Sequence, residues 1–133
     1  MGAVIARPAL GQSTTLDGLG FRSGETQSEA TGISADGLVV IGLSNNHAVS
    51  WNSSGVLSDL GAFLATGVNG DGTVIVGQDG SQNPVRWLNG STTPTVLPML
   101  TGLYFGGQAN GVNADGSIIV GYDFGVPGAQ SFI

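Results

Sequence analysis

The chain has 133 residues, which suits one domain, and it has no cysteine, so no disulfide can stabilise it. Charged residues make up only 9%, lysine is absent and the net charge is −6. A nucleic-acid groove needs clustered Lys or Arg, and an anionic membrane surface would repel this chain. We therefore expect neither nucleic acid nor a membrane as a partner, and the start of the chain shows no recognisable signal peptide.

One pattern occurs three times and organises the chain. It reads GISADGLVVIG at 32–42, GVNGDGTVIVG at 67–77 and GVNADGSIIVG at 111–121. The copies stand 35 and 44 residues apart, and periods in this range mark repeat architectures. Glycine supplies 24 of the residues, spread between short apolar runs, which is typical of short strands joined by tight turns.

In chain order, we expect an N-terminal arm at 1–14 and then a short strand at 15–20 (TLDGLG). Each copy should contribute a first strand, an Asp-Gly turn, a second strand and a third strand that ends in an aromatic residue. Asp tolerates positive φ and Gly adopts it freely, so the Asp-Gly pairs are expected to form turns. These turn residues are Asp36, Gly37, Asp71, Gly72, Asp115 and Gly116. Gly42 and Gly77, which end the strongest strands, should have a backbone or packing reason to be glycine.

A fourth strand is expected at 56–61 and at 95–100, where Pro98 indicates a sheet edge. The third copy has no such strand after it, but TLDGLG at 15–20 matches VLSDLG at 56–61. We therefore predict a single repeat domain at 15–133, with units at about 30–61, 65–100 and 109–133 plus 15–20. The N-terminal strand would close the last unit, and Phe132 and Ile133 would be buried there.

The second strands are apolar at consecutive positions, which indicates sheets buried on both faces. The predicted fold is all-β, with three four-stranded antiparallel units packed face to face like propeller blades. A three-sheet β-prism is the alternative. Natural propellers use about four to eight blades, so three blades predict a homo-oligomer, in which two chains would supply six.

The residue pattern favours a protein that is not an enzyme and that has no metal and no cofactor. The Asp-Gly turns lack the ligand spacing and the closing Glu of an EF-hand. His47, the sole histidine, is expected to be a polar loop residue, and no G-x-S-x-G elbow occurs. The carboxylates considered for glycoside hydrolysis are Asp17, Asp59, Glu25 and Glu29, and none of them forms an evident pair.

The candidate ligand-binding residues are aromatic: Trp51, Trp87 and Tyr122. They could stack on sugars, since repeat rings often bind one ligand per blade. Trp51 and Trp87 stand at equivalent strand ends, however, and filling the space between blades is the favoured role for them.

The repeated unit, followed by an aromatic-ended strand and then L-x-x-L-G, resembles the HAF repeat of bacterial proteins assigned to the cell exterior. The stretch LGFRSGETQSEATGISADG at 19–37 is similar to the family's linker. The resemblance implies a β-propeller-like fold with no shared catalytic site. We expect a non-catalytic structural or binding module in a bacteriophage virion (a decoration, tail or fibre protein) or on a bacterial surface. A small oligomeric lectin-like protein that binds glycans is the alternative.

Overall fold

The computed structural model describes residues 16–126 and 128–133, so the expected arm at 1–14 and Thr15 lie outside the described residues. The described chain is all-β and contains three antiparallel sheets. The first sheet has the order β1–β2–β3–β4, the second β5–β6–β7–β8 and the third β11–β10–β9. The expected all-β class is therefore confirmed. The third unit differs from the prediction, because its sheet has three strands where four were expected.

The strands of each sheet follow one another along the chain. In the first sheet they are β1 (Ser28–Ile33), β2 (Val39–Ser44), β3 (His47–Asn52) and β4 (Leu57–Asp59). In the second sheet they are β5 (Leu64–Val68), β6 (Val74–Gln78), β7 (Pro84–Leu88) and β8 (Thr95–Val96). In the third sheet they are β9 (Tyr104–Val112), β10 (Ile119–Gly125) and β11 (Ala129–Phe132).

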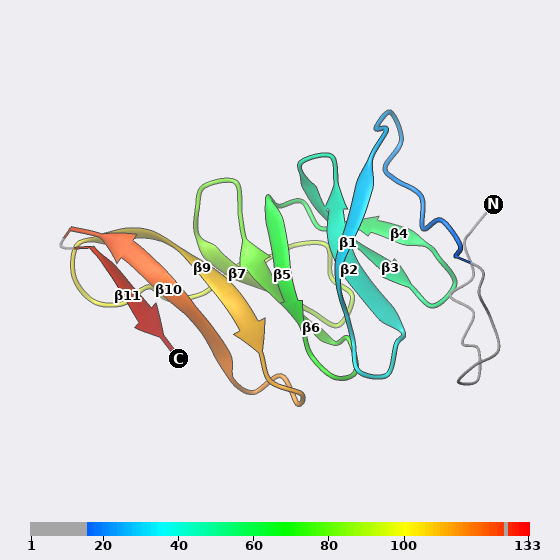
Figure 1. Cartoon of the computed structure of the whole chain (residues 1–133). Coiled ribbons are helices and arrows are strands. Elements are labelled where there is room, and N and C mark those ends of the chain that lie inside the picture. The colour runs from blue at the N-terminus through cyan, green and yellow to red at the C-terminus, as the bar shows by residue number, and fades with distance from the viewer. Residues whose placement is uncertain (1–15, 127) are drawn as a thin grey trace.

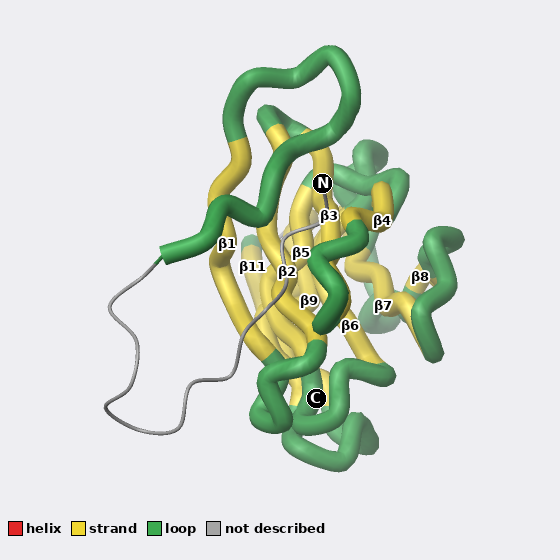
Figure 2. The backbone as a smooth tube through the Cα atoms, turned by 90° about the vertical axis from the view of Figure 1, so that its right-hand side faces the viewer, coloured by secondary structure: helices red, strands yellow, loops and turns green. Residues whose placement is uncertain are grey.

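The three sheets form an open row with the second sheet in the middle (Figure 1). Figure 2 looks along this row, so that strands of the successive sheets lie behind one another. Ile41, Ile75 and Trp87 belong to the core between the first and second sheets, and Val76, Ala109 and Ile119 pack between the second and third. No sheet closes on itself and the described chain forms neither a complete propeller nor a prism.

The predicted closure of the last unit by the N-terminal strand is wrong for the single chain. Residues 16–20 form no strand, and they lie at the opposite end of the row from β11 (Figure 1). Leu19 instead packs on Val40, Val49 and Trp51, on the outer face of the first sheet. The reason is the stacking itself, because sheets packed about 10 Å apart separate the two ends of a three-sheet row.

The end of the chain also differs from the expectation. Phe132 is half-buried against the core of the second and third sheets, but Ile133 is 90% exposed. The prediction that Ile133 is buried depended on a strand beside β11, and among the described strands only β10 pairs with β11.

Three equivalent glycines each lie opposite a β-bulge in the first strand of their sheet. The register shifts between Ala30 and Gly32 and again between Ala65 and Gly67, and the third sheet shifts at Gly121. A β-carbon on Gly42, Gly77 or Gly121 would overlap the backbone carbonyl oxygen of Glu29, Leu64 or Gln108, respectively. The bulge and the glycine therefore require each other in every unit.

Candidate functional site

The three Asp-Gly turns are built by the same hydrogen bonds. Asp71 Oδ1 accepts from the backbone N–H of Thr73 at 3.0 Å, and Asp115 Oδ1 accepts from the backbone N–H of Ser117 at 2.9 Å. Asp36 Oδ1 accepts from the Leu38 N–H at 2.9 Å in the same way. The following glycines take φ of 70° (Gly37), 74° (Gly72) and 79° (Gly116). The carboxylates are thus engaged with their own turns.

These hydrogen bonds also lower the pKa of two of the turn carboxyl groups. The Thr73 side chain holds the pKa of Asp71 below its ordinary value, and the Ser117 side chain does the same for the pKa of Asp115. In each turn the backbone N–H of the same residue adds to the effect. Both turns are therefore most stable with the carboxylate ionised.

Neither candidate tryptophan offers a free ring face. Trp51 and Trp87 are each 1% exposed, and Trp87 packs in the core between the first and second sheets. Its indole Nε1–H donates to the Leu60 carbonyl oxygen at 2.9 Å, whereas Trp51 Nε1 is buried without a hydrogen-bond partner. Trp87 therefore fills space between two sheets, whereas Trp51 is buried with Leu19 on the outer face of the first sheet. Neither ring has a face exposed for stacking on a sugar.

Tyr122 lies elsewhere, on the outer face of the third sheet. It is half-buried, and its ring is 6.4 Å from that of Phe124 between centroids. Phe124 in turn meets Phe105 edge to face at 5.6 Å. The structure thus does not bring the three candidate aromatics together. It forms instead an aromatic group of Phe105, Tyr122 and Phe124, whose two phenylalanines the sequence analysis did not single out.

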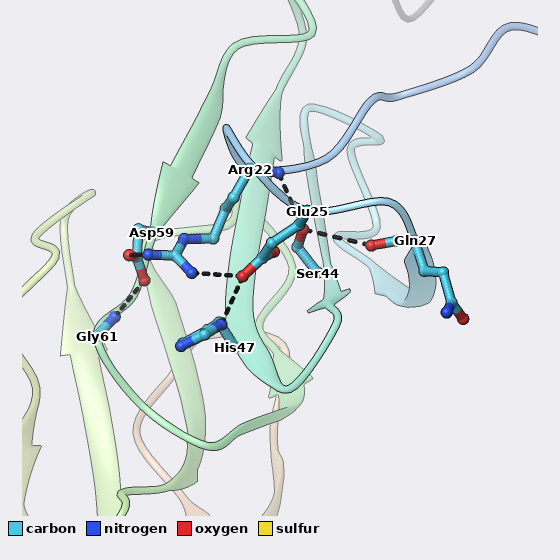
Figure 3. Close-up of polar contacts among 7 residues, drawn as sticks. All are labelled: Arg22, Glu25, Gln27, Ser44, His47, Asp59 and Gly61. Atoms are coloured by element: carbon cyan, nitrogen blue, oxygen red, sulfur yellow. Dashed lines mark hydrogen bonds and ion pairs between the residues drawn. The ribbon is translucent and has the colours of Figure 1, made fainter.

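A charged cluster joins the segment before β1 to the first sheet (Figure 3). Glu25 Oε1 lies 2.6 Å from Arg22 Nη1 and 2.7 Å from His47 Nδ1, and Arg22 Nη2 lies 2.6 Å from Asp59 Oδ2. The Arg22 backbone N–H also donates to Ser44 Oγ at 2.9 Å. Arg22 therefore spans from its own segment to β4 at the edge of the sheet.

Glu25 is the centre of this cluster, with a side chain only 10% exposed. The neighbouring Ser44 hydroxyl lowers the pKa of Glu25 most, burial opposes this, and Arg22 and His47 lower the pKa further. The ion pairs within the cluster span up to 37 positions in sequence, so no local motif announced them. They hold the 22–27 segment against the sheet.

His47 begins β3 and does not sit in a loop as expected. A histidine whose Nδ1 faces a carboxylate is half of the arrangement used for general-base catalysis. In residues 16–126 and 128–133, no serine or threonine hydroxyl donates to His47, and the chain has no cysteine. The contact with Glu25 belongs to the charged cluster that also contains Arg22 and Asp59.

Two clefts occupy equivalent places at the two sheet junctions. The first, of about 240 Å³, is lined by Ser50, Thr73 and Trp87, among others. The second, of about 490 Å³, is lined by Arg86 and Ser117, which match Ser50 and Thr73, and also by Phe132. Arg86 brings a buried Nε with no hydrogen-bond partner to the second cleft. Hydroxyl groups and aromatic edges beside a cleft can bind a small polar ligand.

Asp123 is fully buried between the second and third sheets, and the sequence analysis did not single it out. Its Oδ2 accepts from the Leu100 N–H at 2.6 Å, while Oδ1 is buried without a partner. The bond holds the segment after β8 against the third sheet. Phe124 and Gly125, which follow Asp123, form no pattern that predicts a buried aspartate.

No group of three His, Cys, Asp or Glu side chains in the described part of the chain is placed to hold a metal ion. Across the same residues there is no helix with the length and apolarity needed to cross a membrane. Comparisons with protein-family models, with curated proteins and with solved structures found no match to this chain.

Proposed function

We propose that this chain is a non-catalytic structural and binding module, displayed on an exposed surface. A bacteriophage particle, as a decoration, tail or fibre component, or a bacterial cell surface would be its setting. The observation that carries the proposal is the repetition of one sheet-to-sheet contact. Gly72 of the second sheet approaches Val39 of the first so closely that a β-carbon would overlap it, and Gly116 of the third approaches Val74 of the second likewise.

The use of the charged groups supports the same proposal. The described carboxylates that make hydrogen bonds do so largely with turn backbone or within the Arg22 cluster. Such groups stabilise a scaffold, and a catalytic carboxylate needs instead a free position beside a substrate. The resemblance of the repeat to the HAF repeat adds an extracellular setting and a propeller-like arrangement of the sheets as blades.

The test is to locate the protein on intact particles and intact cells. Antibodies against the purified chain should label virions from an induced lysate or the surface of unbroken bacteria. An antibody against a cytoplasmic protein, used in parallel, controls for lysis. Label that appears only after cells are broken, together with absence from purified particles, would contradict the proposal.

Glycan binding is the second candidate, and the repeated cleft favours it. Both junctions place a hydroxyl residue, Thr73 or Ser117, in the lining of a cleft. A glycan array is the direct test. Arg86 lines the second cleft, and Ser50 occupies the matching position in the first. If each junction holds one site, Arg86→Ala should therefore remove about half of the glycan-binding capacity.

A further inference from the structure

We infer that two copies of this chain associate head to tail, so that the third sheet of each copy packs on the first sheet of the other. The inference deepens the proposed function, on which it rests, by naming a partner: a second copy of the chain. It also says which parts of the chain complete each other. The two internal junctions show how one sheet of this kind packs on the next.

The third sheet has an open face where the other two sheets are covered. Ile41 and Val76 occupy equivalent positions, each facing the next sheet, and each is 0% exposed. Val120 is their equivalent in the third sheet, and it is 43% exposed. Ile118, the equivalent of Val39 and Val74, is 46% exposed. This face therefore lacks only the sheet that the repeat would place on it.

The first sheet has the complementary open face. Ala65 of β5 and Ala109 of β9 are 5% and 0% exposed, because each faces the preceding sheet. Ala30 of β1 is their equivalent, and it is exposed, as is most of β1. Ile33 on the same strand is 57% exposed, although its equivalents Val68 and Val112 are packed. Among the described residues, no sheet precedes β1 on this face.

Hydrogen bonds also cross the two internal junctions, and the equivalent polar groups at the two outer faces have no neighbouring sheet to bond in the described part of the chain. The Thr66 hydroxyl in the β5 bulge donates across the junction to the Ala109 carbonyl oxygen. Asn110 stands at the Thr66 position in the third sheet and is exposed, so its amide can donate to the Ala30 carbonyl oxygen of a second copy. Turn-to-turn bonds also run along the row, from Asp36 N to Gly70 O at 3.0 Å and from Gly70 N to Ala114 O at 2.9 Å.

The third sheet has three strands among the described residues, whereas the first and second sheets have four. Leu57 pairs with Trp51 and Ser58 with Ser50, and the segment then places Leu60 on Trp87 of the next sheet. Leu19 sits on Trp51 of the first sheet as Leu60 sits on Trp87. Residues 16–19 therefore stand where the end of a preceding unit would stand.

In a head-to-tail pair, this preceding unit is the third sheet of the other copy. Gly18 would then come opposite Phe132 of that copy, as Asp59 lies opposite Val49, because Phe132 and Val49 both pair with the equivalent glycine of their sheet. Asp17 would come opposite Ile133, which is now 90% exposed. The strand β11 would gain the neighbour that it lacks, and the third sheet would reach four strands. The match of residues 15–20 to 56–61 is thus satisfied between chains.

Two copies are the number that the geometry favours. They supply six sheets, within the range of about four to eight blades that close a ring. The outer face of the third sheet presents Val120, Tyr122 and Phe124, which carry no charge, so this side of the contact buries no ionised group from these residues. If a twofold axis relates the copies, the third sheet of each packs on the first sheet of the other, and no end face of either row is left free.

The first experiment measures the mass of the intact protein by light scattering across a hundredfold range of micromolar concentrations. We expect twice the 13.3 kDa of one chain. Val120→Asp places a charge in the junction and should shift the mass to one chain with an unchanged far-ultraviolet spectrum. Val96→Asp is the matched control, because Val96 is 51% exposed on β8 away from the junction, and it should remain a dimer. A wild-type mass of one chain throughout would overturn the inference.

The second experiment uses the absence of cysteine in the chain. Asp17→Cys combined with Ile133→Cys should form a covalent dimer under mild oxidation, since these two positions would pair between copies. Within one chain, residues 16–20 and β11 lie at opposite ends of the row. Asp17→Cys with Ser81→Cys, in the exposed turn between β6 and β7, should not. Equal crosslinking by Ile133→Cys alone would indicate a symmetric contact between two third sheets and would overturn head-to-tail packing.

These outcomes are separable from the proposed function. A monomer that still labels intact particles would leave surface display standing and remove the head-to-tail pair. A dimer found only inside cells would do the reverse.

Discussion

The indole Nε1–H of Trp87 donates to the backbone carbonyl of Leu60 at 2.9 Å, across the junction of the first and second sheets. Leu60 is 2% exposed, so its carbonyl has no ready access to water. The equivalent Trp51 is buried to the same extent, but its Nε1 has no partner. The two tryptophans are therefore equally buried, but only Trp87 makes a hydrogen bond through its indole N–H.

Trp87→Phe should destabilise the protein more than Trp51→Phe. Both changes remove part of a buried ring, but only the first leaves a buried carbonyl unpaired, which costs about 1–3 kcal/mol. We expect a difference of that size in the free energy of unfolding, measured by urea titration. Equal losses in the two variants would show that the hydrogen bond between Trp87 and Leu60 contributes nothing.

Gly77→Ala should be far more damaging than Gly80→Ala. A β-carbon on Gly77 would overlap the Leu64 carbonyl oxygen, and the bulge would have to shift. Overpacking of this kind costs about 1–3 kcal/mol. Gly80 has no atom within 4 Å of the added carbon, so its substitution should change stability by about 0.5 kcal/mol or less. Similar melting temperatures for the two variants would refute the coupling of bulge and glycine.

Gly72→Ala and Gly90→Ala separate backbone strain from sheet packing. Both glycines have φ of 74°, so both variants carry the same left-handed penalty of about 1–2 kcal/mol. Only at Gly72 would the new carbon overlap a side chain of the neighbouring sheet, that of Val39. We therefore expect Gly72→Ala to lose about 1–3 kcal/mol more by chemical denaturation. If the two losses agree, the approach of the second sheet to the first does not depend on this glycine.

Acid should destabilise the protein in a defined window. The folded-state pKa values of Glu25, Asp71 and Asp115 lie below the ordinary values of 4.5 for Glu and 3.8 for Asp. Carboxyls with a lowered folded-state pKa stabilise the fold above the ordinary value, and this stability is lost as the pH falls through the folded-state pKa. Urea unfolding should therefore show stability falling below about pH 4.5. The double variant Asp71→Asn, Asp115→Asn keeps a side-chain acceptor in each turn, and its stability should depend less on pH. An unchanged slope in that variant would remove the turns from the explanation.

The local part of the fold was predictable from the sequence. An Asp-Gly pair specifies its turn within about five residues, since the carboxylate accepts from the N–H two positions on and the glycine supplies the positive φ. The apolar second strands likewise indicated sheets covered on both faces. Gly42 and Gly77 were expected to have a structural reason, and the bulge opposite each of them supplies it.

The long-range part was decided by the stacking of the sheets. The match of residues 15–20 to 56–61 identified a fourth-strand segment, but only the tertiary structure shows that Leu19 packs on Trp51 of the first sheet. The link from Arg22 to Asp59 also depends on how the segment before β1 crosses the sheet. A turn forms from residues that the chain already holds together, whereas these contacts join residues that come together only after whole sheets have packed.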